Sequence, residues 1–302
     1  MRTVVTALLL LLLAGNTLAE APVLVLDSPN APGLPQGFRR CDGPYLTAAP
    51  NPPTRGGLGN CRFSGSSQFS ALGLEALLLV LPQDPVIIDL RQESHGFIDG
   101  AAVSWHAPKD FANTGKSLLQ IEVDESARLG RLAKAGIAVV TEVKTWDTEG
   151  AIGECSMLTL MSGDAQTEKS LLHGTKARSL RLPVTDHMAP SNAVVDAFLR
   201  FYRSVPIDTW LHFHCRAGHG RTTVFMVMAD MLVNATLVSA EDIVVRQALL
   251  GGKNLFATTA PGWKKPLAQE RAEFLRRFYA YATDNPRGRP QLWGEWLAEK
   301  GM

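Results

Sequence analysis

The chain has 302 residues and a formal charge of +1, with 46% hydrophobic and 20% charged residues. This composition excludes a disordered tail, a collagen-like rod and a coiled coil, and the length allows one or two domains with a buried core. A general nucleic-acid binder needs a basic excess, so no nucleic-acid partner is expected, and any anionic ligand must be bound by locally clustered basic residues.

The first twenty residues have the pattern of a secretory signal peptide. Arg2 gives a positive start, an apolar run with six consecutive leucines follows, and small residues lead to Ala19. The run is too short to span a bilayer, which takes about 20 apolar residues, and no other stretch is long enough, so no membrane segment is expected. We expect cleavage after residue 19 and an exported mature chain, residues 20–302, in the periplasm or outside the cell.

Further along, helical and strand patterns alternate. Residues 20–60 are rich in Pro and Gly and are expected to wrap irregularly over the surface. The apolar spacing predicts helices over 70–81, 191–203, 222–232, 239–250 and 266–282, and strands over 86–90, 138–140, 179–184 and 211–214. Ser191 and Ser239 are placed as N-caps. Strands alternating with helices indicate the α/β class.

The chemistry is concentrated in the turn after strand 211–214. Cys215 is followed six residues later by Arg221, and Gly218 and Gly220 permit a tight cradle of inward-pointing amides. The helix that starts near Arg221 adds its positive dipole end, which favours a bound anion and a thiolate at Cys215. Arg221 can hold two phosphate oxygens with its planar fork, and Thr222 places a hydroxyl close to the sulfur.

Other interpretations of this turn are weaker. A buried structural cysteine would not require the flanking histidine, glycines and threonine, and a Walker-type loop would end in Gly-Lys-Ser/Thr. His212 and His214 share one strand face whereas Cys215 points away, and no second ligand cluster is present, so no metal and no other cofactor is expected. The segment resembles the Cys-x5-Arg signature of the protein tyrosine phosphatase superfamily.

A cysteine nucleophile needs an acid, because attack on a phosphomonoester expels an alkoxide that must be protonated. Asp186 lies 29 positions before Cys215, in a loop between strand 179–184 and the helix that Ser191 caps. We expect this loop to bring Asp186 onto the cradle as a mobile acid, and the alternative is that Asp186 only starts the turn.

The resemblance extends to the bacterial protein tyrosine phosphatase-like (PTP-like) phytases, also called cysteine phytases. The segments that carry it are LPQGFR (34–39), SGSS (64–67), DLRQESHG (89–96), QTE (166–168), TDH (185–187), HFHC (212–215), GRTT (220–223), RQ (246–247), GG (251–252) and WK (263–264). The match covers nearly the whole mature chain. It implies a tyrosine-phosphatase core with a small partial β-barrel subdomain, built mainly from about residues 101–165. It also implies stepwise, metal-independent removal of phosphates from myo-inositol hexakisphosphate.

The resemblance assigns roles to particular residues. Cys215 becomes the nucleophile, Arg221 the phosphate clamp and Asp186 the general acid and base. The cradle residues implied to bind the substrate are Arg216, Ala217, Gly218, His219, Gly220 and Thr222. The further substrate-binding residues are His187 beside the acid and Arg39, Lys144 and Lys264 around the phosphates that are not being cleaved. Each of these last three, taken singly, can also be an ordinary surface charge.

Two features depart from the family pattern. The family often has an acidic or small residue where this chain has Arg216, and an apolar residue where it has His219. These two basic-capable residues resemble the cradle of phosphoinositide phosphatases and are expected to strengthen polyphosphate binding. The lysine-rich stretch that the family has before its Trp-Lys pair is reduced to the uncharged residues 256–259. One phosphate contact is therefore expected to be missing or replaced by Arg216.

The remaining cysteines and functions stay open at this stage. In an oxidising compartment Cys41 and Cys61 would be the natural disulfide pair, contributing roughly 3 kcal/mol, and the alternative is that Cys41, Cys61 and Cys155 are buried reduced thiols. The alternative functions are an exported protein tyrosine phosphatase, a phosphoinositide phosphatase and an inactive phosphate-binding module. The expected partner is a small polyanionic substrate, namely inositol phosphates, and the expected oligomeric state is a monomer.

Overall fold

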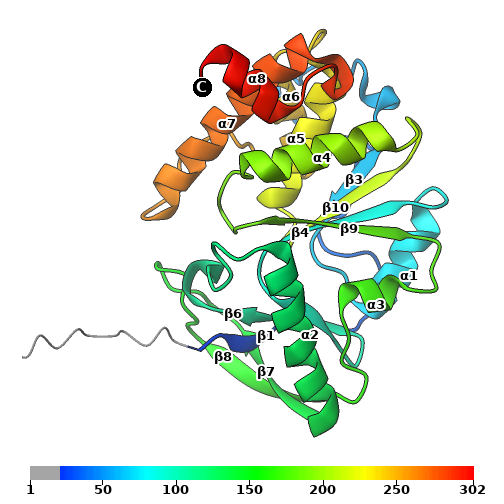
Figure 1. Cartoon of the computed structure of the whole chain (residues 1–302), viewed down its shortest axis with the longest axis vertical. Coiled ribbons are helices and arrows are strands. Elements are labelled where there is room, and N and C mark those ends of the chain that lie inside the picture. The colour runs from blue at the N-terminus through cyan, green and yellow to red at the C-terminus, as the bar shows by residue number, and fades with distance from the viewer. Residues whose placement is uncertain (1–20) are drawn as a thin grey trace, which may run out of the picture.

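The computed structural model describes residues 21–302, so the predicted signal peptide lies outside the described residues. Two five-stranded sheets organise these residues, and Figure 1 shows helices α4 to α8 stacked above one sheet and the second sheet, with α2, below it. Helices and strands both contribute to the two layers, which confirms the predicted α/β class. Within residues 21–302, no helix combines the length and the hydropathy needed to cross a bilayer.

The core sheet has the order β2-β3-β10-β4-β9. Its strands are β2 (Arg39–Arg40), β3 (Phe63–Ser66), β4 (Val86–Arg91), β9 (Arg178–Val184) and β10 (Leu211–His214). Strand β10 lies between β3 and β4, parallel to both, and all four of its residues are buried. Its carboxyl end is therefore held on both sides, and the turn that begins with Cys215 starts from a fixed position.

The second sheet has the order β5-β6-β1-β7-β8. Its strands are β1 (Val23–Ser28), β5 (His95–Ile98), β6 (Ala101–His106), β7 (Ile137–Val143) and β8 (Cys155–Met161). The expectation that residues 20–60 are irregular is wrong for β1, which pairs antiparallel with β6 and parallel with β7. The sheet also takes β5 from outside the range 101–165 expected for a subdomain.

The helices cover both sheets. They are α1 (Ala71–Val80), α2 (Leu118–Ala135), α3 (Glu168–Leu172), α4 (Asn192–Ser204), α5 (Arg221–Asn234), α6 (Ala240–Leu249), α7 (Lys264–Asp284) and α8 (Trp293–Lys300). Helix α5 is buried along nearly its whole length, because it packs on β3 and β10 and is covered by α6 and α7. The predicted N-caps are confirmed: Ser191 accepts the amide of Val194, and Ser239 that of Asp242.

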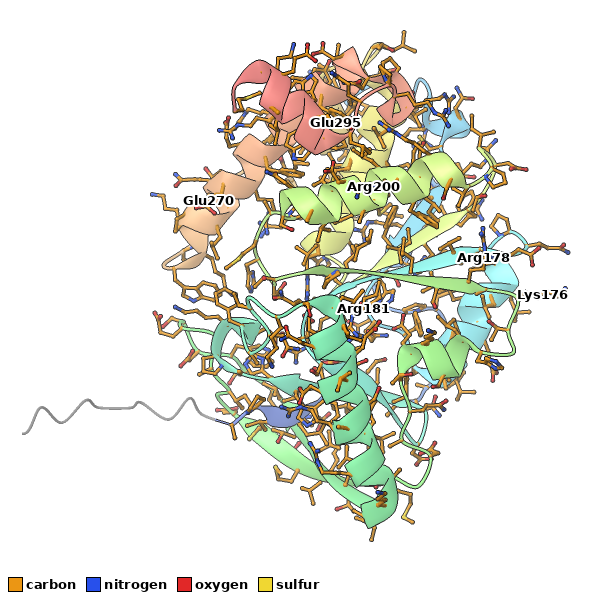
Figure 2. All side chains as sticks on the ribbon, viewed as in Figure 1. Lys176, Arg178, Arg181, Arg200, Glu270 and Glu295 are labelled. Atoms are coloured by element: carbon orange, nitrogen blue, oxygen red, sulfur yellow. The ribbon has the colours of Figure 1, made fainter. Side chains whose placement is uncertain are left out.

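Charged side chains join the two layers where they meet. Arg181 on β9 lies at the end of α2 in Figure 2, and its guanidinium is 3.0 Å from Glu125 on α2 and 3.0 Å from Asp89 on β4. Removing one partner of a buried ion pair leaves the other charge uncompensated, which is costly. These contacts therefore hold α2, which packs on the second sheet, against the core sheet.

The cysteines other than Cys215 are free thiols in this structure. Cys41 and Cys61 are buried close together in the main core, and the amide of Phe63 donates to the Cys41 sulfur. Cys155, at the start of β8, is exposed, so the alternative of three buried thiols is wrong for this residue.

Candidate active site

The turn from Cys215 to Gly220 connects β10 to α5, and two hydrogen-bond donors surround its sulfur atom. The Cys215 Sγ atom accepts hydrogen bonds from the Gly218 amide, at 3.3 Å, and from the Thr222 hydroxyl, at 3.1 Å. The second contact is the one that the sequence predicts for Thr222. Only 2% of the surface of Cys215 is exposed, and the residue lines a pocket.

Only one of the two predicted glycines is required by the geometry of the turn. Gly218 has φ +76°, and a Cβ atom there would lie 2.6 Å from the Ser67 amide nitrogen. Gly220 has φ −88°, and the nearest atom to its Cβ position, on Arg271, is 3.8 Å away. A side chain is therefore excluded at Gly218 but fits at Gly220.

The amino end of α5 faces the same space. The helix starts at Arg221, and its N-cap residue Gly220 has no side chain to accept the first amides. Those unpaired amides and the helix dipole make this end a favourable place for an anion. The cradle therefore provides sulfur and anion-binding donors within one turn.

Arg221 is buried and held by carboxylates on two sides. Its NH1 and NH2 atoms are 2.6 and 2.9 Å from the Glu93 carboxylate, and its Nε is 3.2 Å from Asp186. Burial lowers the pKa of Arg221, but Asp186 and Glu93 raise it well above its usual value, so the group stays charged. Glu93 lies in the DLRQESHG segment, but sequence reasoning assigned it no role.

The predicted acid lies in the loop after β9. Asp186 is close to both Arg221 and the His187 ring, whose Nε2 is 3.2 Å from its carboxylate. Burial raises the pKa of Asp186, but Arg221 and His187 lower it further, so it lies below its ordinary value. His187 has φ +64°, an uncommon conformation for a residue other than glycine, and its ring packs edge-on against Trp263 at 5.1 Å.

These groups line a pocket of about 500 Å³ between the two sheets. Of the predicted site residues, the lining includes Cys215, Asp186, Arg221, His187, Arg216, Ala217, His219, Gly220 and Lys264. Its basic residues are Lys109, Arg216, Arg221, Lys253, Lys264 and Arg271, and its carboxylates are Asp27, Asp110 and Asp186. Basic groups outnumber acidic ones two to one here, although the whole chain is close to neutral.

Four predicted residues lie outside the lining. Gly218 and Thr222 form the back of the cradle. Arg39 is buried behind it and donates to the Gly218 carbonyl at 2.9 Å and to the Thr223 hydroxyl at 3.0 Å. Lys144 is 52% exposed and paired with Glu142. The phosphate-binding roles that the family resemblance implies for Arg39 and Lys144 remain predictions.

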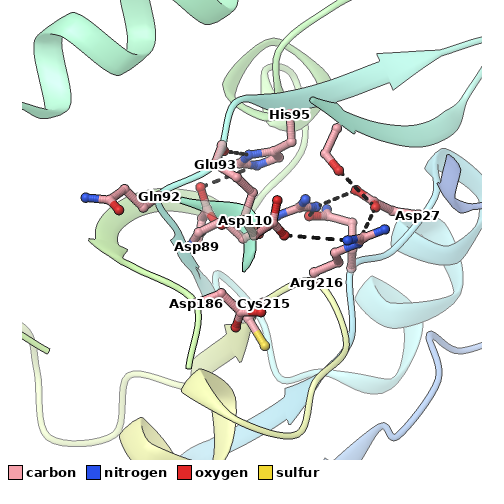
Figure 3. A network of polar contacts seen from close by, with 12 residues as sticks. Asp27, Asp89, Gln92, Glu93, His95, Asp110, Asp186, Cys215 and Arg216 are labelled. Atoms are coloured by element: carbon pink, nitrogen blue, oxygen red, sulfur yellow. Dashed lines mark hydrogen bonds and ion pairs between the residues drawn. The ribbon is translucent and has the colours of Figure 1, made fainter. Parts of the chain in front are cut away.

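Arg216 is already engaged by acidic groups. Figure 3 shows it between Asp27 and Asp110, and its guanidinium is 2.7 Å from the first and 3.5 Å from the second. Its face also lies over the Trp146 ring, 4.8 Å from the centroid. Sequence reasoning missed both carboxylates, because they come from β1 and from the 3-10 turn Pro108–Asp110, far from the cradle in the chain.

The histidines next to the cradle have other partners. His212 contacts the hydroxyls of Ser64 and Ser66, and His214 bonds Glu168 at 2.9 Å. Among residues 21–302, no three His, Cys, Asp or Glu side chains are grouped so that they could hold a metal ion.

A family model and the solved structures point to the same family. A family model described as PTP-like phytase, inositol hexakisphosphate, matches residues 88–233. A PTP-like phytase from Bdellovibrio bacteriovorus is 34% identical, with a TM-score of 0.71, over 93% of this chain and 96% of that one. The PTP-like myo-inositol phosphatase from Mitsuokella multacida, solved with myo-inositol-(1,3,4,5)-tetrakisphosphate, is also 34% identical, with a TM-score of 0.84 over 92% of this chain.

A third relative is an effector. The effector protein hopD2 of Pseudomonas syringae pv. tomato is 28% identical over 284 residues, which are 92% of this chain. The chain spans 60% of the length of hopD2 and 48% of that of the Mitsuokella structure. The likeness to the solved structures confirms the expected phosphatase-like fold.

Proposed function

This chain belongs to the PTP-like phytase family, and from that premise we propose that it removes phosphates stepwise from myo-inositol hexakisphosphate through a phosphocysteine intermediate. The observation that carries the proposal is the pocket itself. It places the Cys215 sulfur, the Asp186 carboxyl and a surplus of cations around one space, in a chain that is otherwise neutral. A protein without a large net charge can attract a densely charged anion only through a local cluster of cationic side chains.

In the first step, the Cys215 thiolate attacks phosphorus, the S–P bond forms and the bond from phosphorus to the inositol oxygen breaks. The proton on the Asp186 carboxyl passes to that leaving oxygen. In the second step, a water oxygen attacks phosphorus, the S–P bond breaks and sulfur leaves as thiolate, while Asp186 takes the proton from the water. Arg221 and the α5 amides hold the phosphate oxygens in both steps.

The low pKa of Asp186 describes the pocket without substrate, where Arg221 is its neighbour. A phosphate dianion bound at Arg221 brings negative charge close to the carboxylate, and a nearby like charge favours the protonated form. Substrate binding thereby favours the protonated form of Asp186, which the first step requires.

The test is phosphate release by the purified protein with chelator present, comparing myo-inositol hexakisphosphate with a phosphotyrosine peptide at mildly acidic and neutral pH. We expect faster release from the inositol phosphate, no effect of the chelator, and no release by Cys215→Ser. Faster release from the peptide would show that inositol hexakisphosphate is not the preferred substrate, and it would favour the second candidate, an exported protein tyrosine phosphatase. Export of that candidate fits the likeness to hopD2, which is described as an effector protein.

We also propose that the chain is exported to the periplasm or beyond as a monomer. The support for export is the leader-like sequence of residues 1–19, whereas the monomer carries over the expectation from the sequence. N-terminal sequencing of the protein recovered from a cell fraction tests cleavage, and light scattering of the same material tests the oligomeric state.

A further inference from the structure

Arg271 on α7 is a buried arginine at the pocket that the mechanism above does not use. It lines the cavity although only 6% of its surface is exposed, and its Nε has no hydrogen-bond partner among residues 21–302. Burial lowers the pKa of this guanidinium, and Asp186 opposes the shift only in part. A charged group is costly to bury in this way, so a role at the site is the natural reason for its position.

Arg271 lies between the loop that carries Asp186 and the end of the cradle. Its NH1 atom donates a hydrogen bond of 3.0 Å to the carbonyl of His187, directly after Asp186. The same NH1 atom is the nearest atom to the position that a Cβ would take at Gly220, 3.8 Å away. The side chain thus bonds the acid loop and lies close to the amino end of α5.

The acid loop needs such a support. His187 adopts φ +64°, which an L-residue takes up only when its surroundings hold it there. Trp263 holds the ring from one side, and Arg271 holds the peptide carbonyl. Asp186 directly precedes His187, so a change in the backbone conformation of His187 would shift the Asp186 carboxyl relative to Arg221 and the cradle.

We propose that Arg271 is a positioning residue, which locks the acid loop over the cradle so that Asp186 delivers its proton to the leaving oxygen. The inference rests on the proposed phosphatase reaction and adds to it a residue that acts through the acid. It predicts that losing Arg271 harms the reaction in proportion to how much the leaving group needs a proton.

The test compares phenyl phosphate with p-nitrophenyl phosphate, two monophosphates of equal charge. Nitrophenolate leaves without a proton, whereas phenolate depends on the acid. The quantity measured is the rate of phenol release in a single turnover, because the second step uses Asp186 as a base with both substrates. We expect Arg271→Ala to lower this rate for phenyl phosphate by roughly 30-fold, less than the ~10²–10⁴-fold of general acid catalysis because the acid is displaced and not removed. For p-nitrophenyl phosphate the rate should fall by no more than about threefold. With phenyl phosphate, the wild-type rate should fall as Asp186 loses its proton at higher pH, and this fall should be lost in Arg271→Ala.

A double-mutant cycle makes the test specific. In an Asp186→Asn background, Arg271→Ala should cause no further loss, because the group through which it acts is already removed. Arg271→Lys keeps a donor and should recover part of the rate of phenol release. This variant also tests the inference if Arg271→Ala does not fold. Arg277→Ala is the matched control, since Arg277 lies on the same helix and is half exposed.

Two results would overturn the inference in an active wild-type protein. Equal losses on both aryl phosphates, or a loss that adds fully to that of Asp186→Asn, would make Arg271 a phosphate ligand or a structural residue. A change in KM alone would have the same meaning. A wild-type protein inactive on both aryl phosphates and on inositol hexakisphosphate would instead refute the proposed function.

Discussion

Glu93→Gln is the substitution whose effect on stability follows most directly from the contacts at the site. The two oxygens of Glu93 receive three N–H groups, one from Arg91 at 2.8 Å and two from Arg221 at 2.6 and 2.9 Å. All three side chains are buried. A glutamine of the same shape has one NH2 group in place of an oxygen, so one donor faces another donor whichever way the amide turns.

The size of the effect follows from the burial. Removing one partner of a buried ion pair costs about 3–5 kcal/mol, because the remaining charge is left without compensation. For a chain of this length that corresponds to a fall in melting temperature of roughly 10 °C. Urea unfolding of the wild type and the variant at neutral pH measures the difference.

The control is Glu273→Gln on α7, which makes the same chemical change in an exposed pair with Arg277. Exposed pairs contribute about 0–1 kcal/mol, so little change is expected. If Glu93→Gln loses no more stability than this control, the reasoning from burial is refuted.

The advantage of Glu93 over glutamine should also depend on pH. Burial raises the pKa of Glu93, but Arg221 and Arg91 lower it well below its usual value. A depressed pKa means that the carboxylate stabilises the fold above the unfolded-state pKa of about 4.3, and that this contribution is lost as the pH falls through the folded-state pKa. The difference in unfolding free energy should therefore be constant above about pH 5 and shrink in stronger acid.

Three further predictions concern the cradle, the pocket wall and the thiols. Gly218→Ala should cost about 1–3 kcal/mol of stability and most of the activity, whereas Gly220→Ala should be tolerated much better, as urea unfolding and phosphate release will measure. Arg216→Ala should raise KM for inositol hexakisphosphate by roughly tenfold, because the pocket then loses a cation that offsets the Asp27 and Asp110 carboxylates; an equal rise for an aryl phosphate contradicts this. A thiol reagent should label Cys155 in the native protein, and the two core thiols only after unfolding, as peptide mass mapping will measure.

Local signals predicted the elements that carry the chemistry. The helix capped by Ser191 places Val195, Phe198 and Leu199 on one buried face, and this spacing is visible in the sequence. The cradle was equally clear, because Cys215, Gly218 and Arg221 act within one turn. In such segments the residues that specify the structure are the ones that perform the function.

Elements that depend on distant partners were not predicted. Strand β1 lies in a Pro- and Gly-rich region and forms a strand because it pairs with β6 and β7. Helix α2 exposes Leu119 and Val123 and buries Glu125, which obscures its helical pattern. The roles of Glu93 and Arg271 were missed for the same reason, since each acts on a residue that only the completed fold brings near.

The position of β1 determines when the pocket can exist. This strand is the first described element of the chain, yet it lies in the middle of its sheet and supplies Asp27 to Arg91 and Arg216. During synthesis from the amino end, β1 is made long before β7 and the cradle, and such distant pairings form slowly. A partly made chain can therefore contain β1, or even the cysteine, without any pocket, and phosphate binding would report that the two sheets have come together.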